Sequence, residues 1–249
     1  MRINPTYVLH LADNNLILGQ RLGEWCGHGP VLEQDIALTN IALDLIGQAR
    51  LLYQCAAELI GDTSEDALAF LRLEHDYRNV LLVELPNGNF ADTVVRQYFY
   101  DVFNYLNYDA LLQCTDEHLR AIAEKALKEV TYHRRWSGEW VIRLGDGTAE
   151  SHEKVQDAVN HLWEYTGELF SPADFEKESH KMQNTPDVSS LHKAWKKHVV
   201  HTLDTATLRI PRDDIWMQSG GKSGHHSEHM GFILSELQYM QRTYPSMQW

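Results

Sequence analysis

The sequence predicts an all-α fold whose longest helices form an antiparallel bundle, and three observations support this. Apolar residues recur at steps of three and four along most of the 249-residue chain, which is the spacing of one helix face. Breaks rich in glycine and proline, such as CGHGP (26–30), LPNGN (85–89) and GDGT (145–148), separate these segments. Strand-like alternation is essentially missing, which favours helices packed on helices.

Eight helices are expected along the chain. The first ends at the CGHGP turn, the second covers about 32–60, and the third, with Ser and Thr caps, covers about 64–84. The fourth is expected at about 90–112 and the fifth at about 115–144, beginning with Thr-Asp-Glu cap chemistry. The sixth covers about 151–169, a polar loop with two prolines follows at 171–187, and the last two cover about 188–208 and 225–243. We expect one domain, with a core bundle at about 5–144 and accessory helices at about 151–243.

The composition is that of an ordinary globular protein, with 43% hydrophobic and 23% charged residues. A formal net charge of −13 disfavours binding to nucleic acid or to anionic membranes. The three cysteines, Cys26, Cys55 and Cys114, are widely separated and odd in number, which fits a reducing compartment. No window reaches the apolar length of a membrane span, and the N-terminus lacks the pattern of a signal peptide. A cytoplasmic location is therefore expected.

The stretch KEVTYHRRW (128–136) has the residue types of a metal site but not the spacing. Carboxylate-bridged di-iron bundles use Glu-x-x-His on one helix face, whereas here Glu129 precedes His133 by four positions. Val130 occupies the position three before His133 and has no lone pairs to donate to a metal. His133 falls within the predicted core stripe, together with Leu119, Ile122, Ala123, Ala126, Val130, Ser137, Val141 and Leu144. A core histidine bonded to a neighbouring acid or carbonyl is the favoured interpretation.

The second long helix also lacks a carboxylate at the inward position. Within LDLIGQARLLY, the inward pair at i and i+3 consists of Leu45 and Gln48, while Asp44 lies at the edge of the face. Leu45 cannot bind a metal, and an amide is a poor ligand in the place of an imidazole. Both helices therefore place an acid, an apolar residue and then a hydrogen-bonding side chain near the core face.

Five blocks of the sequence, spread over nearly the whole chain, resemble one known family. They are QRLGEWCGHGP (20–30), NIALDLIGQARLLYQCAAEL (40–59), LPNGNFADTVVRQYF (85–99), KEVTYH (128–133) and GGKSGHHSEHMG (220–231). The blocks are similar to the non-catalytic structural subunit of phenylacetyl-CoA 1,2-epoxidase. That enzyme is the ring-epoxidising multicomponent monooxygenase of aerobic phenylacetate degradation.

The resemblance implies a ferritin-like helical fold and a place in an enzyme complex. The implied partner is a homologous catalytic oxygenase subunit that carries the di-iron site and binds the coenzyme A thioester. A small bridging subunit and a reductase with FAD and a 2Fe-2S cluster are the other implied partners. The resemblance implies no cofactor in this chain itself, and self-association of the isolated chain is a further expectation.

The iron pattern of the catalytic homologue can be placed on this sequence residue by residue. It falls on Glu24, on Leu45 and Gln48, on Asp101, and on Val130 and His133. Both bridging carboxylates are thus replaced by aliphatic residues, and the resemblance implies a degenerate site without metal. We hypothesise that a charged His133 pairs with Asp101 or Glu24 in place of the iron. The competing interpretation is that each of these polar groups bonds to backbone or water.

The string GGKSGHHSEHMG offers a second candidate site. Here His225 and His229 have a zinc-compatible i, i+4 spacing at the expected start of a helix, but no third ligand is evident. A glycine-rich turn that faces a partner subunit or the coenzyme A moiety is favoured, and an inert helix cap is the alternative. The residues concerned are Lys222, His225, His226, Glu228 and His229.

Three functions therefore compete. The first is the structural subunit that binds and stabilises a catalytic homologue. The second is a stand-alone ferritin-like metal-dependent oxidase that uses Glu24, Asp101, Glu129 and His133 in an unusual arrangement. The third is a metal-binding module centred on His225 and His229. Metal analysis of the chain, alone and with its partner, distinguishes them.

Overall fold

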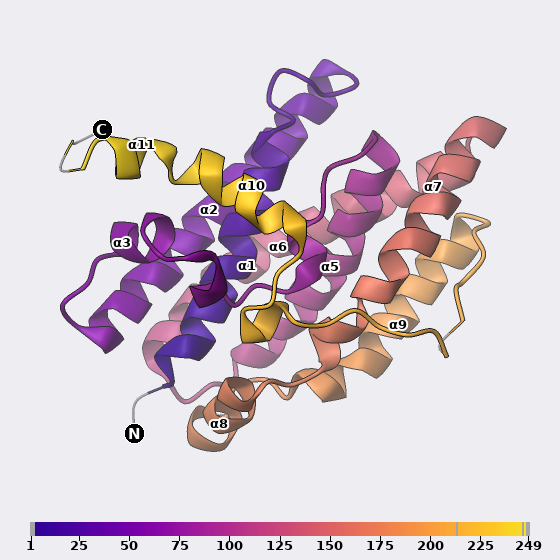
Figure 1. Ribbon diagram of the computed structural model, residues 1–249. Coiled ribbons are helices and arrows are strands. Elements are labelled where there is room, and N and C mark those ends of the chain that lie inside the picture. Colours follow the sequence, from indigo (N-terminus) through magenta and orange to yellow (C-terminus); the bar gives the residue numbers. More distant parts are fainter. Residues whose placement is uncertain (1–2, 213, 246, 248–249) are drawn as a thin grey trace. The chain divides into compact units, whose positions relative to one another are not determined.

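The computed structural model describes residues 3–212, 214–245 and 247, and every regular element within these ranges is a helix (Figure 1). The chain divides into two compact units. The first unit contains residues 1–86 and 220–249, and the second contains residues 87–219. The boundary after residue 86 falls inside the segment that the sequence assigns to one core bundle, so the single-domain organisation stays a prediction.

The first unit is built on a helical hairpin. Helix α1 (Pro5–Gly23) is joined through the turn at 24–31 to α2 (Leu32–Ile60), and the two pack along their length (Figure 1). At Gly19 the helices approach so closely that an added Cβ would lie 3.0 Å from the Cγ1 of Ile46 and 3.3 Å from the carbonyl oxygen of Ala42. The predicted limits of the second helix, 32–60, are confirmed. Helix pairs joined by a short turn are a common supersecondary unit.

Shorter elements complete the first unit, and its last part returns from the far end of the sequence. These elements are α3 (Glu65–Phe70), the 3₁₀ turn η1 (Glu74–Asp76), α4 (Leu81–Glu84), the 3₁₀ turn η4 (Gly221–Ser223), α10 (Glu228–Leu237) and α11 (Tyr239–Thr243). Helix α10 packs against α1, α4 and η1. The C-terminal segment is thus part of the same unit as the N-terminal hairpin.

The prediction of one continuous helix at 64–84 is wrong, because the chain is irregular between residues 71 and 80 apart from the single turn η1. The backbone N–H groups of Arg78 and Val80 donate to side chains of α1, namely to Asp13 at 2.8 Å and to Asn14 at 2.9 Å. These bonds replace the helical hydrogen bonds that the apolar periodicity alone predicts.

The second unit contains the other two long helices, which also pack along their length. In α5 (Phe90–Leu111) and α6 (Glu117–Gly145), Phe90 meets Trp140 near one end with ring centroids 5.3 Å apart. Nearer the other end, the guanidinium of Arg134 lies 3.8 Å from the ring centroid of Tyr105. The helices are therefore antiparallel, as predicted.

Five further elements cover this pair. They are α7 (Ala149–Leu162), the 3₁₀ turns η2 (Trp163–Tyr165) and η3 (Gly167–Phe170), α8 (Asp174–Gln183) and α9 (Val188–Thr205). An aromatic core of Phe99, Trp163, Phe170 and Trp195 joins η2, η3 and α9 to α5, with several ring pairs between 5.2 and 5.8 Å apart. The indole N–H of Trp195 donates to the carbonyl of Phe99 at 2.8 Å, so this core is specified by polar as well as apolar contacts.

Two predictions for this region are corrected. The segment 171–187 is not a loop throughout, because α8 occupies most of it. The two prolines, Pro172 and Pro186, lie outside both ends of that helix, where they do not interrupt it. Glu176 also caps the helix start by accepting from the backbone N–H of Ala173 at 2.7 Å. The sixth predicted helix ends at Leu162 rather than near 169, and its last part forms η2 and η3.

Among the described residues, none of the helices combines the length and the apolar character that crossing a bilayer requires. Even the 29-residue α2 carries charged side chains along its length, including Glu33, Asp44 and Arg50.

Candidate functional site

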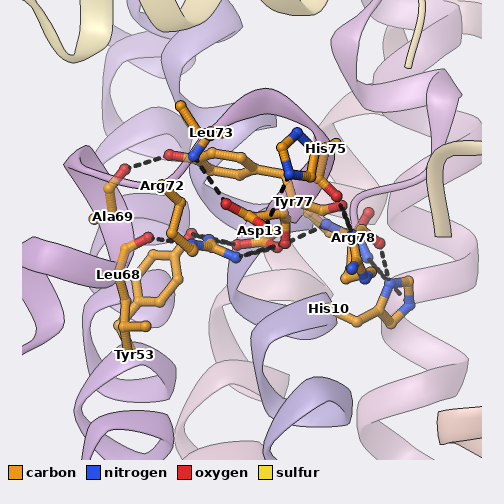
Figure 2. Close-up of polar contacts among 12 residues, drawn as sticks. His10, Asp13, Tyr53, Leu68, Ala69, Arg72, Leu73, His75, Tyr77 and Arg78 are labelled. Atoms are coloured by element: carbon orange, nitrogen blue, oxygen red, sulfur yellow. Dashed lines mark hydrogen bonds and ion pairs between the residues drawn. The ribbon is translucent and has the colours of Figure 1, made fainter. Parts of the chain in front are cut away.

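A buried polar network in the first unit centres on Asp13 of α1 (Figure 2). Its carboxylate accepts hydrogen bonds from the hydroxyl of Tyr53 at 2.6 Å and from the backbone N–H of Arg78 at 2.8 Å. The guanidinium of Arg72 forms an ion pair with both carboxylate oxygens. The Arg72 side chain also lies over the ring of Tyr77, 4.1 Å from its centroid. Asp13 thus ties α1, α2 and the irregular segment together.

The charges in this network alter the properties of its members. Burial raises the pKa of Tyr53 well above its ordinary value, and the negative charge of Asp13 adds to the effect. Burial also raises the pKa of Tyr77 to about 12. Burial disfavours the charged form of Arg72, but the neighbouring Asp13 more than offsets this, so the pKa of Arg72 is raised. The arrangement therefore holds a fixed ion pair, with both tyrosines neutral at physiological pH.

A second buried carboxylate, Glu84 in α4, holds the returning C-terminal segment. It accepts from the ring Nδ1 of His226 at 2.9 Å, from the backbone N–H of Ser227 at 2.6 Å and from the amide of Asn79 at 3.1 Å. The side chains of Glu84 and His226 are both fully buried. Burial lowers the pKa of His226, but hydrogen bonding and the charge of Glu84 outweigh it, so this pKa is raised overall.

The glycines of the GGKSG turn are explained by close approach within the same unit. A Cβ added to Gly221 would lie 2.2 Å from the carbonyl oxygen of Asn79, and one added to Gly224 would lie 2.3 Å from that of His75. Gly224 also has a φ of 82°, in the left-handed region. The turn is therefore seated on residues 75–81 of its own chain.

The five residues predicted to face a partner or coenzyme A have different environments. Lys222 and the His226 side chain are buried, whereas His225 and Glu228 are exposed and His229 is half-buried. The predicted helix start at His225 is wrong, because Ser227 caps α10 and the helix begins at Glu228. His225 and His229 therefore do not lie one turn apart on one helix. A partner-facing role for the exposed residues stays a prediction.

Three of the positions on which the iron pattern of the catalytic homologue falls lie in the first unit. One of them is an acid at the surface and the other two are core residues. Glu24 lies just beyond the end of α1 with its side chain 32% exposed, and it accepts from Arg21 at 2.9 Å. Leu45 is fully buried in α2, on the side that packs against Gly19. Gln48, one turn later, is also buried. The inward pair on α2 thus presents an aliphatic side chain and an amide.

The corresponding positions in the second unit lie on α5 and α6. Val130 and His133 are fully buried, as the predicted core stripe requires, and Glu129 is half-buried at its edge. Asp101 of α5 accepts from the amide of Gln97 at 2.6 Å and from the hydroxyl of Ser137 at 2.8 Å.

The charge balance around Asp101 bears on the proposed pairing with His133. Burial raises the pKa of Asp101 from 3.8 to about 6, although His133, Ser137 and Gln97 each act to lower it. The attraction of His133 is the largest of these opposing effects, followed by the hydrogen bonds from Ser137 and Gln97, but burial outweighs all of them. The charged pairing of His133 with Asp101 or Glu24 stays a hypothesis.

Within the parts of the chain that the structure describes, no group of three or more His, Cys, Asp or Glu side chains is placed to hold a metal ion. The residue types explain this for each long helix pair. A di-iron centre of the carboxylate-bridged kind needs inward Glu-x-x-His pairs, and α2 and α6 supply Leu45 and Val130 at the carboxylate positions. The residues present do not fit such a centre.

Sequence reasoning missed the two carboxylates that organise the first unit, Asp13 and Glu84. A signal was present in α1, where His10, Asp13, Asn14 and Asn15 interrupt an otherwise apolar helix and are all buried. Buried polar residues on a helix of this kind require partners. The partners lie about 40 to 65 residues away in the sequence, so helical periodicity could not identify them.

Comparisons with known proteins place the chain in a family. The model of the family described as "Phenylacetic acid catabolic protein" matches residues 4–249. The chain is 48% identical over 243 residues to the C subunit of 1,2-phenylacetyl-CoA epoxidase from Escherichia coli (strain K12), with 98% of each chain covered. It is 23% identical over 209 residues to the A subunit of the 1,2-phenylacetyl-CoA epoxidase of the same strain, with 82% of this chain and 66% of that protein covered.

These matches confirm the resemblance first drawn from the five sequence blocks, and with it the all-α, ferritin-like fold class. Because the family model covers nearly the whole sequence, the chain belongs to the phenylacetic acid catabolic protein family.

Proposed function

We propose that this chain is the structural, C-type component of a multisubunit phenylacetyl-CoA epoxidase, in which it binds and stabilises a homologous catalytic subunit. The observation that carries the proposal is the 48% identity to the C subunit of such an epoxidase along 98% of both chains. The weaker similarity to the A subunit supports a partner of related fold.

The chemistry of the buried positions supports a non-catalytic role. Activation of dioxygen at a di-iron centre needs carboxylates that bridge and charge-balance two cations. Leu45 and Val130 are fully buried and aliphatic, so neither helix can offer such a bridge. The polar groups that remain, such as Asp101, are bonded to neighbours in their own unit. The chain has the helices of such a bundle but not its bridging carboxylates.

The other components follow from the resemblance and are part of the proposal. The catalytic partner would hold the di-iron centre and the thioester substrate, a reductase would supply electrons through FAD and a 2Fe-2S cluster, and a small bridging subunit would join the complex. A cytoplasmic location fits an enzyme of coenzyme A thioesters and the three cysteines, which are present as thiols.

Co-expression with an A-type partner tests this function. Size-exclusion chromatography with light scattering should show one stable hetero-oligomer, whereas the isolated chain should turn over no phenylacetyl-CoA. A chain that never associates with the partner would contradict the proposal. Zinc near one per chain that is lost in a His225→Ala, His229→Ala variant would instead favour the metal-binding module.

A further inference from the structure

The imidazole of His226 lies between two hydrogen-bond acceptors. Its Nδ1 is 2.9 Å from Oε2 of Glu84, and its Nε2 is 3.2 Å from the carbonyl oxygen of Tyr77. An ionised carboxylate and a carbonyl can only accept, so both ring nitrogens must carry a proton for both bonds to form. The geometry therefore selects the charged imidazolium, in a side chain that is fully buried.

A neutral His226 cannot make both contacts. If Nδ1 keeps its proton, the lone pair of Nε2 faces the Tyr77 carbonyl, and if Nε2 keeps it, the lone pair of Nδ1 faces the carboxylate. Either tautomer brings two buried acceptors together and removes the charge that balances Glu84. The bonds that Glu84 accepts from the Ser227 N–H and the Asn79 amide are unaffected, so the contact is weakened rather than abolished.

The charged groups around His226 act in both directions. Burial disfavours the charged imidazole, whereas the hydrogen bond and charge of Glu84 in α4, the Tyr77 carbonyl and the charge of Glu74 in η1 favour it, so the pKa of His226 is raised overall. The guanidinium of Arg78 donates at 2.7 Å to the same Tyr77 carbonyl and is a nearby positive charge. On α1, Arg21 donates at 2.9 Å to the backbone carbonyl of Glu84. Other titratable side chains on the elements packed here are His10 and Asp13 of α1, Lys222 of η4, and Glu228 and His229 of α10.

The segment that carries His226 is attached to the rest of its unit largely through polar contacts. Three apolar side chains of α10 are buried, namely Met230, Ile233 and Leu234. Beyond them, the amide of Gln238 donates to the Tyr77 hydroxyl at 2.9 Å and to the Arg72 carbonyl at 3.0 Å. The turn before α10 is seated through glycines, which have no side chain to bury. A segment with so few buried apolar groups opens at a lower free energy than the long helices do.

We propose that residues 220–243 form a pH-controlled clasp, which protonated His226 closes onto residues 71–84 and which opens, with α1 and α2 still folded, when that proton is lost to solvent. The clasp is independent of the proposed function, because it requires no partner chain. It is closed below the ordinary histidine pKa of 6.5 and weakens as the pH rises through the raised pKa of His226. Opening uncovers the apolar side of α10 and the backbone on which the glycine turn is seated.

Hydrogen–deuterium exchange of the purified full-length chain, followed by mass spectrometry, tests the clasp. Exchange would be compared at about pH 6 and about pH 8.5, on either side of the histidine range, with each rate corrected for the intrinsic effect of pH. Protection of the α10 amides should fall at least about tenfold at the higher pH, the size expected for losing one hydrogen bond to a charged group. The amides of α2 should keep their protection.

Three variants assign the effect to the buried pair. In His226→Gln the side chain cannot become charged, so α10 should be weakly protected at both pH values. Glu84→Gln should also remove the pH dependence, because the carboxylate that holds the proton on His226 is gone. His75→Gln is the matched control: His75 also belongs to the seat of the turn, but its side chain is 71% exposed, so this variant should keep the pH dependence of the wild type.

Each outcome decides for or against the clasp. Equal protection of α10 at both pH values in the wild type overturns the proposal. A His226→Gln variant that keeps the wild-type pH dependence also overturns it, because another group then carries the proton. Equal losses of protection in α10 and α2 would mean that the whole unit opens, which contradicts a clasp. Circular dichroism monitors the fold of each variant, and Glu84→Gln decides the matter if His226→Gln does not fold.

Discussion

Replacing Asp13 with alanine should reduce the free energy of unfolding by about 3–5 kcal/mol, because it breaks a buried ion pair from one side. Asp13 is fully buried and accepts from Tyr53 at 2.6 Å and from the Arg78 N–H at 2.8 Å. Each hydrogen bond to a charged group contributes about 1.5–3 kcal/mol, but bonds that share one carboxylate do not add fully. The Arg72 side chain, which is only 12% exposed, would be left as an uncompensated charge.

Urea denaturation followed by circular dichroism measures this effect, and a double-mutant cycle assigns it to the pair. An Asp13→Ala, Arg72→Met variant should be more stable than Asp13→Ala alone, because the unpaired charge is gone. Glu150→Ala is the control: Glu150 pairs with Lys154 at 2.6 Å but is solvent-exposed, so its loss should leave the midpoint unchanged.

The reasoning would be refuted by a loss of less than about 1 kcal/mol in Asp13→Ala, the size of an ordinary surface substitution. An Asp13→Ala, Arg72→Met variant no more stable than Asp13→Ala would also contradict it. In that case the destabilisation would come from lost packing rather than from the buried guanidinium.

Three further predictions concern the pH dependence of stability and the exposed face of α2. Because the pKa of His226 is raised above the ordinary histidine value of 6.5, the protonated form of His226 stabilises the fold at low pH. This contribution to stability is lost as the pH rises above 6.5. The variant His226→Gln should therefore show a smaller decline in Tm between pH 6.5 and 8 than the wild type. For Asp101, a pKa raised from 3.8 to about 6 means that stability falls by about 3 kcal/mol as pH rises from about 4 to 6. Asp101→Asn should remove that slope in urea titrations, and an unchanged slope would count against the assigned pKa. Gly47→Ala should stabilise the isolated chain by up to about 1 kcal/mol, because alanine is the better helix former and its Cβ would have no packing neighbour within 4 Å. A destabilised variant would show that the glycine is needed within the chain.

The long helices could be predicted from the sequence because their periodicity is local. The expected range of 32–60 for α2 matches Leu32–Ile60, and the predicted core stripe of α6, with Val130 and His133 inside, is buried except for Leu144, which is half-buried near the end of the helix. The same periodicity identified Leu45 as an inward aliphatic residue. These predictions depend only on which side chains share a helix face.

The remaining features depend on partners that are distant in the sequence. Asp13 and Arg72 are 59 positions apart, and Glu84 and His226 are 142 apart. The break between α3 and α4 follows from the same cause, since side chains of α1 take the backbone groups of that segment. Helix α8 was missed because Pro172 and Pro186 suggested a loop, although they only bound the helix. A polar residue in an apolar helix is a signal that a partner exists, but it does not say where the partner lies.

The iron content of the complex tests the central claim most directly, namely that this chain supplies the fold but not the chemistry of the epoxidase. The chain would be purified alone and then with its A-type partner, and each sample would be analysed for metal and for phenylacetyl-CoA turnover. We expect the chain alone to bind no iron and the complex to contain about two irons per catalytic subunit, as a complete carboxylate site requires. Two irons bound by the isolated chain, or oxygenase turnover by it alone, would contradict this account.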